Sequence, residues 1–274
     1  MSRLFLSSVI AAAAFVSVSA HSYSITIGNN NNDQYISDPL SGKKSKYQTN
    51  PAFIETFDRQ GEAASAASFP EAYTAPAGDN SLCGLTTPAN VTGGTYGFGI
   101  GTVGGSHARP KDDKTCYAFG PGNNGTVPVD GSGNLASVTV DYSALLEESG
   151  AFLNYFGLYY GSIDQYNKIE FYDGANGSGN LVATVTGTNI LGACGVACDG
   201  DQFSEATNIY VNLFFTQEEQ FRSFTFSTTG IAVEIDNLAV GINIPNPVPE
   251  PASLALLGAG LAALGLSRRR KTAM

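Results

Sequence analysis

Short segments rich in Tyr, Phe, Thr and Val recur through the middle of the chain, and turns containing Gly, Asn or Ser separate them. The first set of residue types favours β-strands and the second favours turns. Ten such segments are residues 53–57, 95–103, 114–119, 136–142, 154–160, 167–172, 181–186, 210–215, 221–228 and 231–240. Apolar residues alternate in several of them, so that Val138, Val140 and Tyr142 share one face. Because no helical segments alternate with these strands, the pattern predicts an all-β fold, an antiparallel β-sandwich of jelly-roll type.

The sandwich domain is expected to span residues 21–243 of the 274-residue chain. Its first part, residues 21–50, begins with a strand-like SYSITI and then becomes rich in Asn and Lys, which predicts a partly ordered arm. Within the domain, only YSALLEES, residues 142–149, has a pattern that predicts a short helix.

The body of the chain is strongly acidic. Between residues 21 and 251 there are nine basic residues and 24 acidic residues, a net charge of −15. Such a surface repels nucleic acids and anionic membranes, so we expect no nucleic-acid partner. Carboxylates and amides in turns favour a hard cation such as calcium.

The N-terminus carries Arg3, an apolar run over residues 4–18, and then Val-Ser-Ala at residues 18–20. A basic residue, a short apolar run and small residues at a cleavage site are typical of a secretory signal peptide. A membrane anchor or a buried helix is the alternative interpretation, but the run is short. We therefore expect residues 1–20 to form a signal helix that signal peptidase removes after Ala20 during export.

The chain has four cysteines, Cys83, Cys116, Cys194 and Cys198. An even number in an exported protein favours disulfides. Proximity in sequence favours the pairs Cys83–Cys116 and Cys194–Cys198, which is one of three pairings that four cysteines allow. A metal site would need C-x2-C pairs or nearby histidines, and the C-x3-C segment offers neither.

A 15-residue apolar run, residues 252–266, lies near the C-terminus. A bilayer core needs about 20 apolar residues, so this run is marginal as a permanent span. Basic residues behind it would stay on the cytoplasmic side. These features predict a linker (244–251), a short transmembrane helix (252–267) and a basic cytoplasmic tail (268–274), which together form a transient inner-membrane anchor.

Three ordered elements therefore close the chain: a Pro-Glu-Pro motif, a short apolar helix and an arginine cluster. The motif residues are Val248, Pro249, Glu250 and Pro251, and the cluster residues are Arg268, Arg269 and Arg270. This ending resembles the PEP-CTERM sorting signal of exported bacterial proteins. The resemblance implies recognition by an exosortase, cleavage near the Pro-Glu-Pro, and a Gram-negative host that makes extracellular polysaccharide. An ordinary tail anchor behind a proline linker is the alternative.

Two segments of the body carry a second resemblance. FGLYYGSIDQYNKIEFYDG, residues 156–174, and the strand-rich stretch over residues 209–240 are similar to a family of exosortase-dependent surface proteins. Members of that family share an FGLYWGSIDxYN-like segment, and Tyr160 stands where they have Trp. The resemblance implies a surface protein and supplies no catalytic residues.

Carboxylates lie on the first and last expected strands of the sandwich. Glu55 and Asp58 flank the early strand, and Glu234 and Asp236 lie on the last one. Because such strands are often adjacent in jelly-roll binding modules, Glu55, Asp58 and Asp236 are candidate ligands for a structural calcium. Alternation gives a simpler interpretation, in which Glu234 and Asp236 share one face while Ile235 packs into the core. A glycosidase would also need two carboxyls, but sequence spacing does not show their separation.

The chain has two histidines, and cleavage after Ala20 would make His21 the N-terminal residue of the mature protein. An N-terminal His and a second His, here His107, would match the ligand set of copper-dependent polysaccharide monooxygenases. His107 lies in a loop-like segment, however, and nothing else resembles that family. No G-x-S-x-G, H-E-x-x-H or P-loop motif occurs. We therefore expect no catalytic residues and no cofactor beyond the calcium.

Aromatic residues crowd the segment around residues 155–166. Tyr159, Tyr160, Asp164 and Tyr166 are the candidate glycan contacts, because aromatic faces beside carboxylates suit sugar rings. The alternative is that alternate aromatics fill the sandwich core.

These features predict an exported cell-surface or extracellular-matrix protein, with a structural or adhesive role in exopolysaccharide or biofilm. A carbohydrate-binding, lectin-like module is the first alternative. A secreted polysaccharide-active enzyme is the second.

Overall fold

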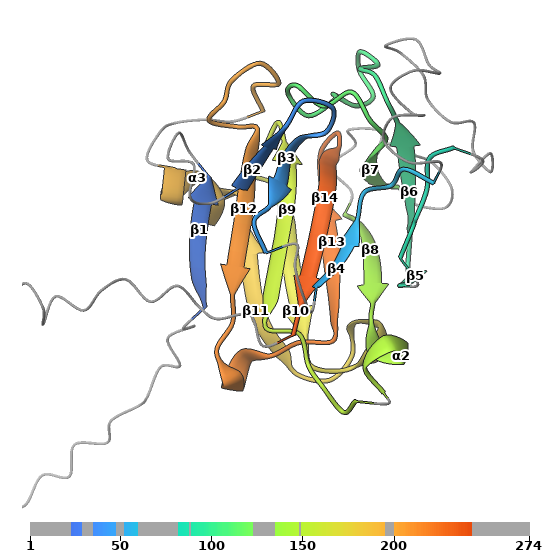
Figure 1. The fold of residues 1–274 in the computed structure, drawn as a ribbon, viewed down its shortest axis with the longest axis vertical. Coiled ribbons are helices and arrows are strands. Elements are labelled where there is room, and N and C mark those ends of the chain that lie inside the picture. The colour runs from blue at the N-terminus through green and yellow to red at the C-terminus, as the bar shows by residue number, and fades with distance from the viewer. Residues whose placement is uncertain are drawn as a thin grey trace, which may run out of the picture.

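The computed structural model describes residues 23–28, 35–47, 52–59, 82–87, 89–122, 135–147, 149–194 and 200–242 (Figure 1). The predicted signal peptide (1–20), linker (244–251), sorting helix (252–267) and basic tail (268–274) lie outside the described residues. In the part of the chain that is described, no helix is long and apolar enough to cross a membrane.

Two antiparallel sheets and a hairpin form the fold. The larger sheet has seven strands, in the order β1-β12-β9-β14-β7-β6, with β4 also pairing with β14. Its strands are β1 (Ser24–Gly28), β4 (Ala52–Glu55), β6 (Thr95–Gly99), β7 (Tyr117–Gly122), β9 (Tyr155–Gly161), β12 (Ile209–Phe214) and β14 (Val233–Gly241).

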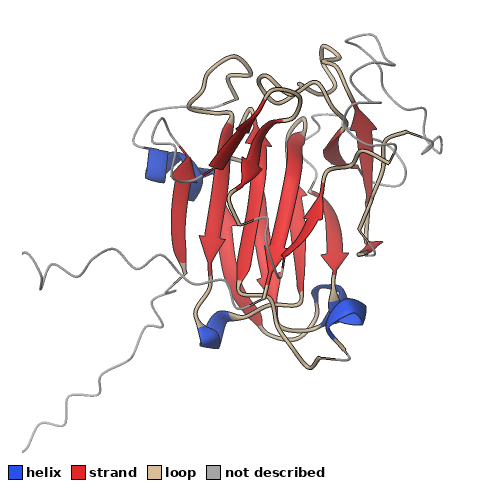
Figure 2. Cartoon of the chain, in the orientation of Figure 1, coloured by secondary structure: helices blue, strands red, loops and turns tan. Residues whose placement is uncertain are grey.

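The second sheet has five strands in the order β11-β10-β13-β8-β5. They are β5 (Asn90–Thr92), β8 (Ala136–Asp141), β10 (Lys168–Tyr172), β11 (Leu181–Thr186) and β13 (Ser223–Thr228). The hairpin consists of β2 (Tyr35–Asp38) and β3 (Gly42–Ser45). Short helices lie at the ends of the sheets (Figure 2): α2 (Ser143–Leu146), η1 (Ala175–Gly177), α3 (Gly187–Cys194) and η2 (Gln217–Glu219).

The core lies between the two sheets. The ring of Phe156 on β9 contacts Phe224 on β13 and Phe171 on β10, with centroid separations of 4.9 and 5.1 Å. Val138 and Val140 are buried on the same side of β8, as the alternation predicted. Burial of these apolar faces is the main favourable contribution to the stability of the sandwich.

Each of the ten expected segments overlaps a strand, and the strands of the described residues pair antiparallel, so the prediction of an antiparallel all-β fold is confirmed. One local prediction is wrong: the 142–149 segment is not the only helix, because α3 forms directly after β11. Asn189 accepts a hydrogen bond from the Thr186 backbone N–H at 2.9 Å, and this local bond supports the turn into α3.

The described parts of residues 21–50 pack onto the body. β1 pairs with β12 along its whole length, and Tyr23 donates a hydrogen bond to the Thr184 carbonyl at 3.0 Å. The β2–β3 hairpin is held by Asn237, whose amide donates to the carbonyls of Ser41 and Lys43, both at 3.1 Å. Tertiary contacts of this kind order a segment whose composition alone indicates a loop.

Candidate functional site

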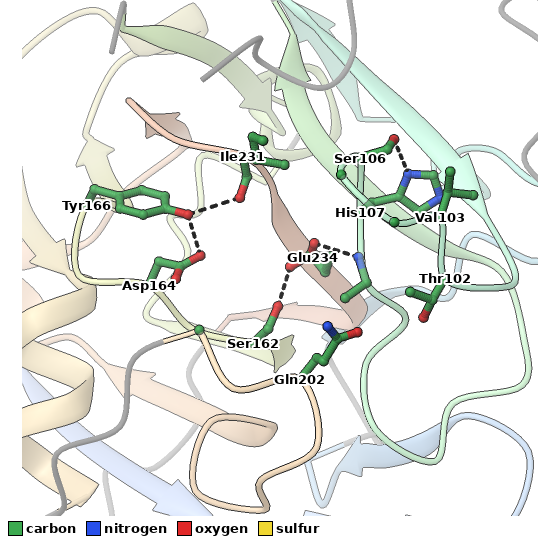
Figure 3. Close-up of a pocket in the computed structure, with 14 residues that line it drawn as sticks. Thr102, Val103, Ser106, His107, Ser162, Asp164, Tyr166, Gln202, Ile231 and Glu234 are labelled. Atoms are coloured by element: carbon green, nitrogen blue, oxygen red, sulfur yellow. Dashed lines mark hydrogen bonds between the residues drawn. The ribbon is translucent and has the colours of Figure 1, made fainter. Parts of the chain in front are cut away.

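A polar pocket of about 220 Å³ opens where four chain segments meet (Figure 3). They are the loop between β6 and β7, the turn between β9 and β10, the loop before β12, and the start of β14. The lining residues are Thr102, Val103, Gly104, Gly105, Ser106, His107, Ala108, Ser162, Asp164, Tyr166, Gly200, Gln202, Ile231 and Glu234.

Glu234 is the buried acid of this pocket. It accepts hydrogen bonds from the Ala108 backbone N–H at 2.9 Å and from the Ser162 hydroxyl at 2.7 Å. Burial raises the pKa of Glu234 to about 8, and these two hydrogen bonds only partly offset that effect. The side chain is therefore mostly protonated at neutral pH, when it is both a hydrogen-bond donor and an acceptor.

His107 lies on the other side of the pocket and is also uncharged at neutral pH. Its ring stacks on Phe119, with a centroid separation of 3.6 Å, and its Nδ1 lies 2.8 Å from the Ser106 hydroxyl. Burial lowers the pKa of His107 to about 4. The hairpin-like turn that contains it is closed by backbone hydrogen bonds between Val103 and His107, at 3.0 and 3.1 Å. His21, the other member of the hypothetical copper pair, lies outside the described residues.

Asp164 and Tyr166 form the more open side. The Tyr166 hydroxyl lies 2.7 Å from Asp164 Oδ2 and 3.0 Å from the Ile231 carbonyl oxygen. The side chains of Tyr166 and Ile231 are 42% and 40% exposed, so the pocket combines a polar interior with a partly apolar rim. Such a combination can hydrogen-bond a polar ligand and also cover one of its faces.

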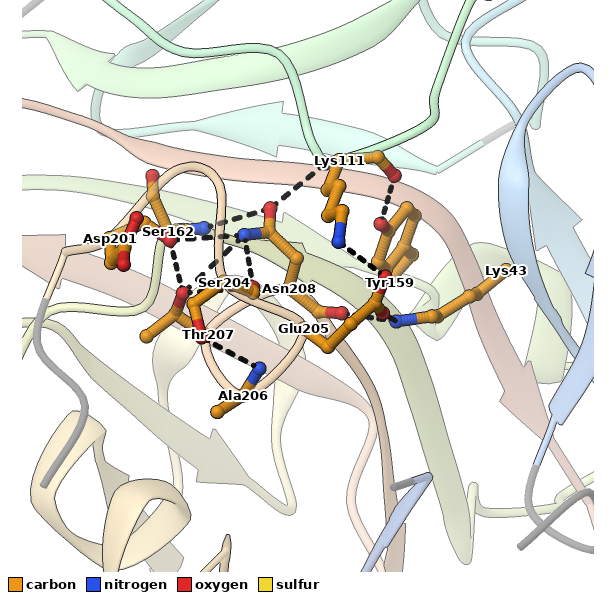
Figure 4. Close-up of polar contacts among 10 residues, drawn as sticks. All are labelled: Lys43, Lys111, Tyr159, Ser162, Asp201, Ser204, Glu205, Ala206, Thr207 and Asn208. Atoms are coloured by element: carbon orange, nitrogen blue, oxygen red, sulfur yellow. Dashed lines mark hydrogen bonds and ion pairs between the residues drawn. The ribbon is translucent and has the colours of Figure 1, made fainter. Parts of the chain in front are cut away.

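Two of the pocket loops are tied to each other by ionic and hydrogen bonds (Figure 4). Lys111 Nζ lies 2.6 Å from Glu205 Oε1, and the Lys111 backbone N–H donates to Asn208 Oδ1 at 2.9 Å. Asn208 also donates to the Ser204 carbonyl at 2.9 Å, and Lys43 Nζ lies 2.9 Å from Glu205 Oε2. These contacts link the two loops, and such preorganisation favours binding.

The structure separates the predicted glycan contacts into two groups. Asp164 and Tyr166 line the pocket, as just described. Tyr159 and Tyr160 are 0% and 1% exposed, so the expectation that their rings contact a sugar is wrong. β9 is buried on both faces, and Lys43 Nζ lies 5.3 Å from the centroid of the Tyr159 ring on the outer side.

The candidate calcium ligands lie near one end of the β4–β14 pair but do not converge on one point. β4 does pair with β14, with Glu55 opposite Leu238. The Glu55 carboxylate accepts hydrogen bonds from the backbone and side chains of Thr86 and Thr87, at 2.6 to 2.9 Å, and from the Phe57 N–H at 2.9 Å.

Asp58 instead accepts a hydrogen bond from the Cys116 N–H at 2.8 Å, and Asp236 is buried on β14 beside Asn237. Among the described residues, no three His, Cys, Asp or Glu side chains form a group able to hold a metal ion. The structure therefore gives these three acids hydrogen-bonding surroundings of their own.

A disulfide joins Cys83 and Cys116, which are both fully buried. It links the segment after β4 to the start of β7. For the second expected pair, Cys198 lies outside the described residues, and only the backbone of Cys194 is described, at the end of α3.

Sequence reasoning missed Ser162, His107 and Gln202 as members of one pocket. The Ser162–Glu234 hydrogen bond joins residues 72 positions apart, so no local pattern reveals it. The available signal was that the GSID and VEID segments both carry the surface-protein resemblance. The structure places these two segments together, because Gly161 pairs with Glu234 in the β9–β14 ladder.

Comparison with known proteins identifies a motif at the C-terminal end of the chain. A family profile described as the PEP-CTERM protein-sorting motif matches residues 247–271. No curated protein and no solved structure matches the chain. The chain therefore carries a PEP-CTERM sorting motif, as its C-terminal residues predicted. This motif marks an exported protein that an exosortase processes and that is sorted through the membrane to the cell surface.

Proposed function

We propose that this protein acts in the exopolysaccharide layer or biofilm of a Gram-negative bacterium, with a structural or adhesive role and no catalytic activity. The supporting observation is the placement of the sorting motif, which begins at residue 247, shortly after β14 ends at Gly241. The described residues before the motif form two packed sheets and a hairpin, and a disulfide joins Cys83 and Cys116 within them. Strands that pass back and forth between the sheets, as from β8 to β9 to β10, support a jelly-roll description of that body.

The sorting step is tested on material released from the cell surface. Mass spectrometry is expected to find peptides of the body but none from residues 252–274, because exosortase cleavage near the Pro-Glu-Pro removes them. Replacing Pro249, Glu250 and Pro251 with alanine is expected to leave the protein in the membrane fraction. Surface material that is intact through Met274 would contradict processing.

The structural role is tested by deleting the gene and measuring cell aggregation and biofilm mass. Loss of both, with restoration by the wild-type gene, is expected. Restoration by a gene encoding the Tyr166→Ala variant would separate a structural role from one that needs the pocket.

A lectin-like function is the second candidate, and the pocket favours it. Asp164, Gln202 and Glu234 offer hydrogen-bonding groups, while Tyr166 and Ile231 supply a partly exposed apolar rim. A glycan array probed with the full chain, purified in detergent, is expected to show saccharide binding that Tyr166→Ala abolishes. Binding that persists in Tyr166→Ala at the wild-type affinity would place the ligand elsewhere.

A further inference from the structure

The charges around the pocket restrict the kind of ligand it can take. Of the fourteen described residues that line the pocket, only His107, Asp164 and Glu234 have an imidazole or a carboxyl side chain, and none is Lys or Arg. At pH 7 the Glu234 carboxyl is mostly protonated and the His107 ring is neutral, because burial raises the pKa of Glu234 and lowers that of His107. Asp164 is thus the one lining side chain left to carry charge, and that charge is negative.

The two lysines that pair with Glu205 do not change this charge balance. Lys43 and Lys111 both form ion pairs with Glu205, at 2.9 and 2.6 Å, and neither lines the pocket. Arg109 follows the lining residue Ala108 but does not line the pocket either. Among the described lining residues, a ligand carboxylate or sulfate would therefore face Asp164 without an arginine or a lysine to pair with. The acidic body, with a net charge of −15 between residues 21 and 251, adds repulsion at longer range.

The remaining lining groups suit hydroxyls. Asp164 and Gln202 side chains, together with the Thr102 hydroxyl, supply acceptors and donors of the kind that sugar hydroxyls pair with. The Tyr166 ring and Ile231 side chain lie at the rim, where they can cover the C–H face of a ring. At about 220 Å³ the pocket is smaller than the roughly 300–1,000 Å³ of sites for drug-sized ligands. It therefore suits a single ring.

We propose that the pocket binds one uncharged sugar ring of a saccharide and rejects the matching uronic acid. This inference rests on the lectin-like candidate function and names its ligand class. Asp164 accepts hydrogen bonds from ring hydroxyls, and the same carboxylate disfavours an acidic sugar.

The test compares pairs of sugars that differ only at C6, where the neutral sugar has a hydroxymethyl group and the uronic acid has a carboxylate. The full chain, purified in detergent, is titrated by calorimetry with glucose and glucuronic acid, and with galactose and galacturonic acid, at pH 7 and low salt. At least one neutral sugar is expected to bind at least tenfold more tightly than its uronic acid. Asp164→Asn is expected to weaken neutral-sugar binding at least fivefold and to narrow the gap between the two sugars.

Two further variants keep the result interpretable. Asp173→Asn changes a carboxylate that hydrogen-bonds Asn180 in the β10–β11 turn, outside the pocket lining, and is expected to bind as wild type does. Tyr166→Phe keeps the ring but removes the hydroxyl that contacts Asp164, so it tests the same side of the pocket if Asp164→Asn fails to fold.

Uronic acids that bind as tightly as neutral sugars, or more tightly, would overturn the ligand class while leaving the lectin-like function standing. Binding of neither class would overturn both. Neutral-sugar binding that Asp164→Asn and Tyr166→Phe leave unchanged would also overturn the inference, because the ligand would then lie outside this pocket.

Discussion

The Ser162 hydroxyl donates a hydrogen bond of 2.7 Å to Glu234 Oε2 in the interior of the fold. Ser162 follows β9 and Glu234 lies at the start of β14, and these strands are neighbours in the larger sheet. The bond therefore joins the two segments whose sequences resemble exosortase-dependent surface proteins. It also fixes the central acid of the pocket.

Removing the Ser162 hydroxyl tests how much this bond stabilises the fold. Ser162→Ala leaves Glu234 Oε2 buried without that donor, and such a loss costs about 1–3 kcal/mol in the free energy of unfolding. Urea denaturation at pH 7 measures the change. Ser178→Ala is the control, because it removes an exposed hydroxyl that contacts the Ala175 carbonyl. Equal stability of the two variants would contradict a role for the Ser162 bond.

Buried acids predict a specific pH dependence of stability. The pKa values of Glu234 and Asp113 are raised to about 8, mainly by burial. The negative charge of Asp164 raises the pKa of Glu234 further, and that of Asp58 raises the pKa of Asp113. Between pH 6.5 and pH 8 the folded protein holds protons that the unfolded chain has released. The free energy of unfolding therefore falls as the pH rises through this window. His107, with its pKa lowered to about 4, has the opposite effect, and that effect falls mainly below pH 6.5, where the unfolded chain binds a proton that the folded protein does not.

Glu234→Gln removes one of the two carboxyl groups that hold a proton in the folded protein and release it on unfolding. The decline in the free energy of unfolding between pH 6.5 and pH 8 is expected to become shallower, by at most about 1.4 kcal/mol per pH unit. Urea denaturation across this pH range measures the slope. Asp113→Asn removes the other contribution, so the double variant is expected to be nearly flat. A slope unchanged by either substitution would show that these acids are ionised in the folded protein.

The ion pairs of Glu205 predict a local effect on the pocket loops. Glu205→Gln weakens both the Lys43 and the Lys111 pairs, at 2.9 and 2.6 Å. Since the Glu205 side chain is 52% exposed, the global free energy of unfolding is expected to change by less than about 1 kcal/mol. Hydrogen exchange of the amides in residues 200–208 is expected to accelerate severalfold.

The matched control for the loop experiment is Glu170→Gln. It breaks the 3.0 Å pair between Lys168 and Glu170 on β10, which lies outside the pocket lining. This variant is expected to leave exchange in residues 200–208 unchanged. Equal acceleration in both variants would mean that Glu205 does not hold the loop.

The disulfide predicts a large loss of stability on reduction. Replacing Cys83 and Cys116 by serine opens a link between residues 33 positions apart and is expected to lower the free energy of unfolding by about 2–5 kcal/mol. Urea denaturation of the oxidised wild type and of the double variant measures the difference. Reducing agent is expected to destabilise the wild type more than the variant. A variant as stable as the oxidised wild type would contradict this contribution.

Strand periodicity predicted much of the sandwich, because burial on one face leaves a two-residue pattern. Val138 and Val140 show it on β8. The same reasoning failed at Tyr159 because the β2–β3 hairpin covers the outer face of β9. Gly42 in that hairpin has φ of +71°, and a Cβ built there would lie 2.6 Å from the Tyr159 ring. A glycine is needed for this close approach, but nothing local shows what it approaches.

The pocket was harder to predict than the fold for a related reason. Its residues come from four segments separated along the chain, and their chemistry depends on burial. Nothing in the local sequence distinguishes Glu234 or His107 from other residues of their types. Burial in the folded protein raises the pKa of Glu234 and lowers that of His107, so that both side chains are uncharged at neutral pH. The sequence identified Asp164 and Tyr166 as candidates because aromatic residues crowd this segment beside a carboxylate. It could not show that Glu234 lies beside them.

β14 lies between β9 and β7 and also pairs with β4, although it is the last strand of the described chain. For a protein exported with its N-terminus leading, the strand at the centre of the larger sheet is therefore the last to emerge. The larger sheet is complete only when β14 pairs with β4, β7 and β9. We therefore expect the body to complete its fold late in translocation, because the sorting motif begins at residue 247, shortly after Gly241.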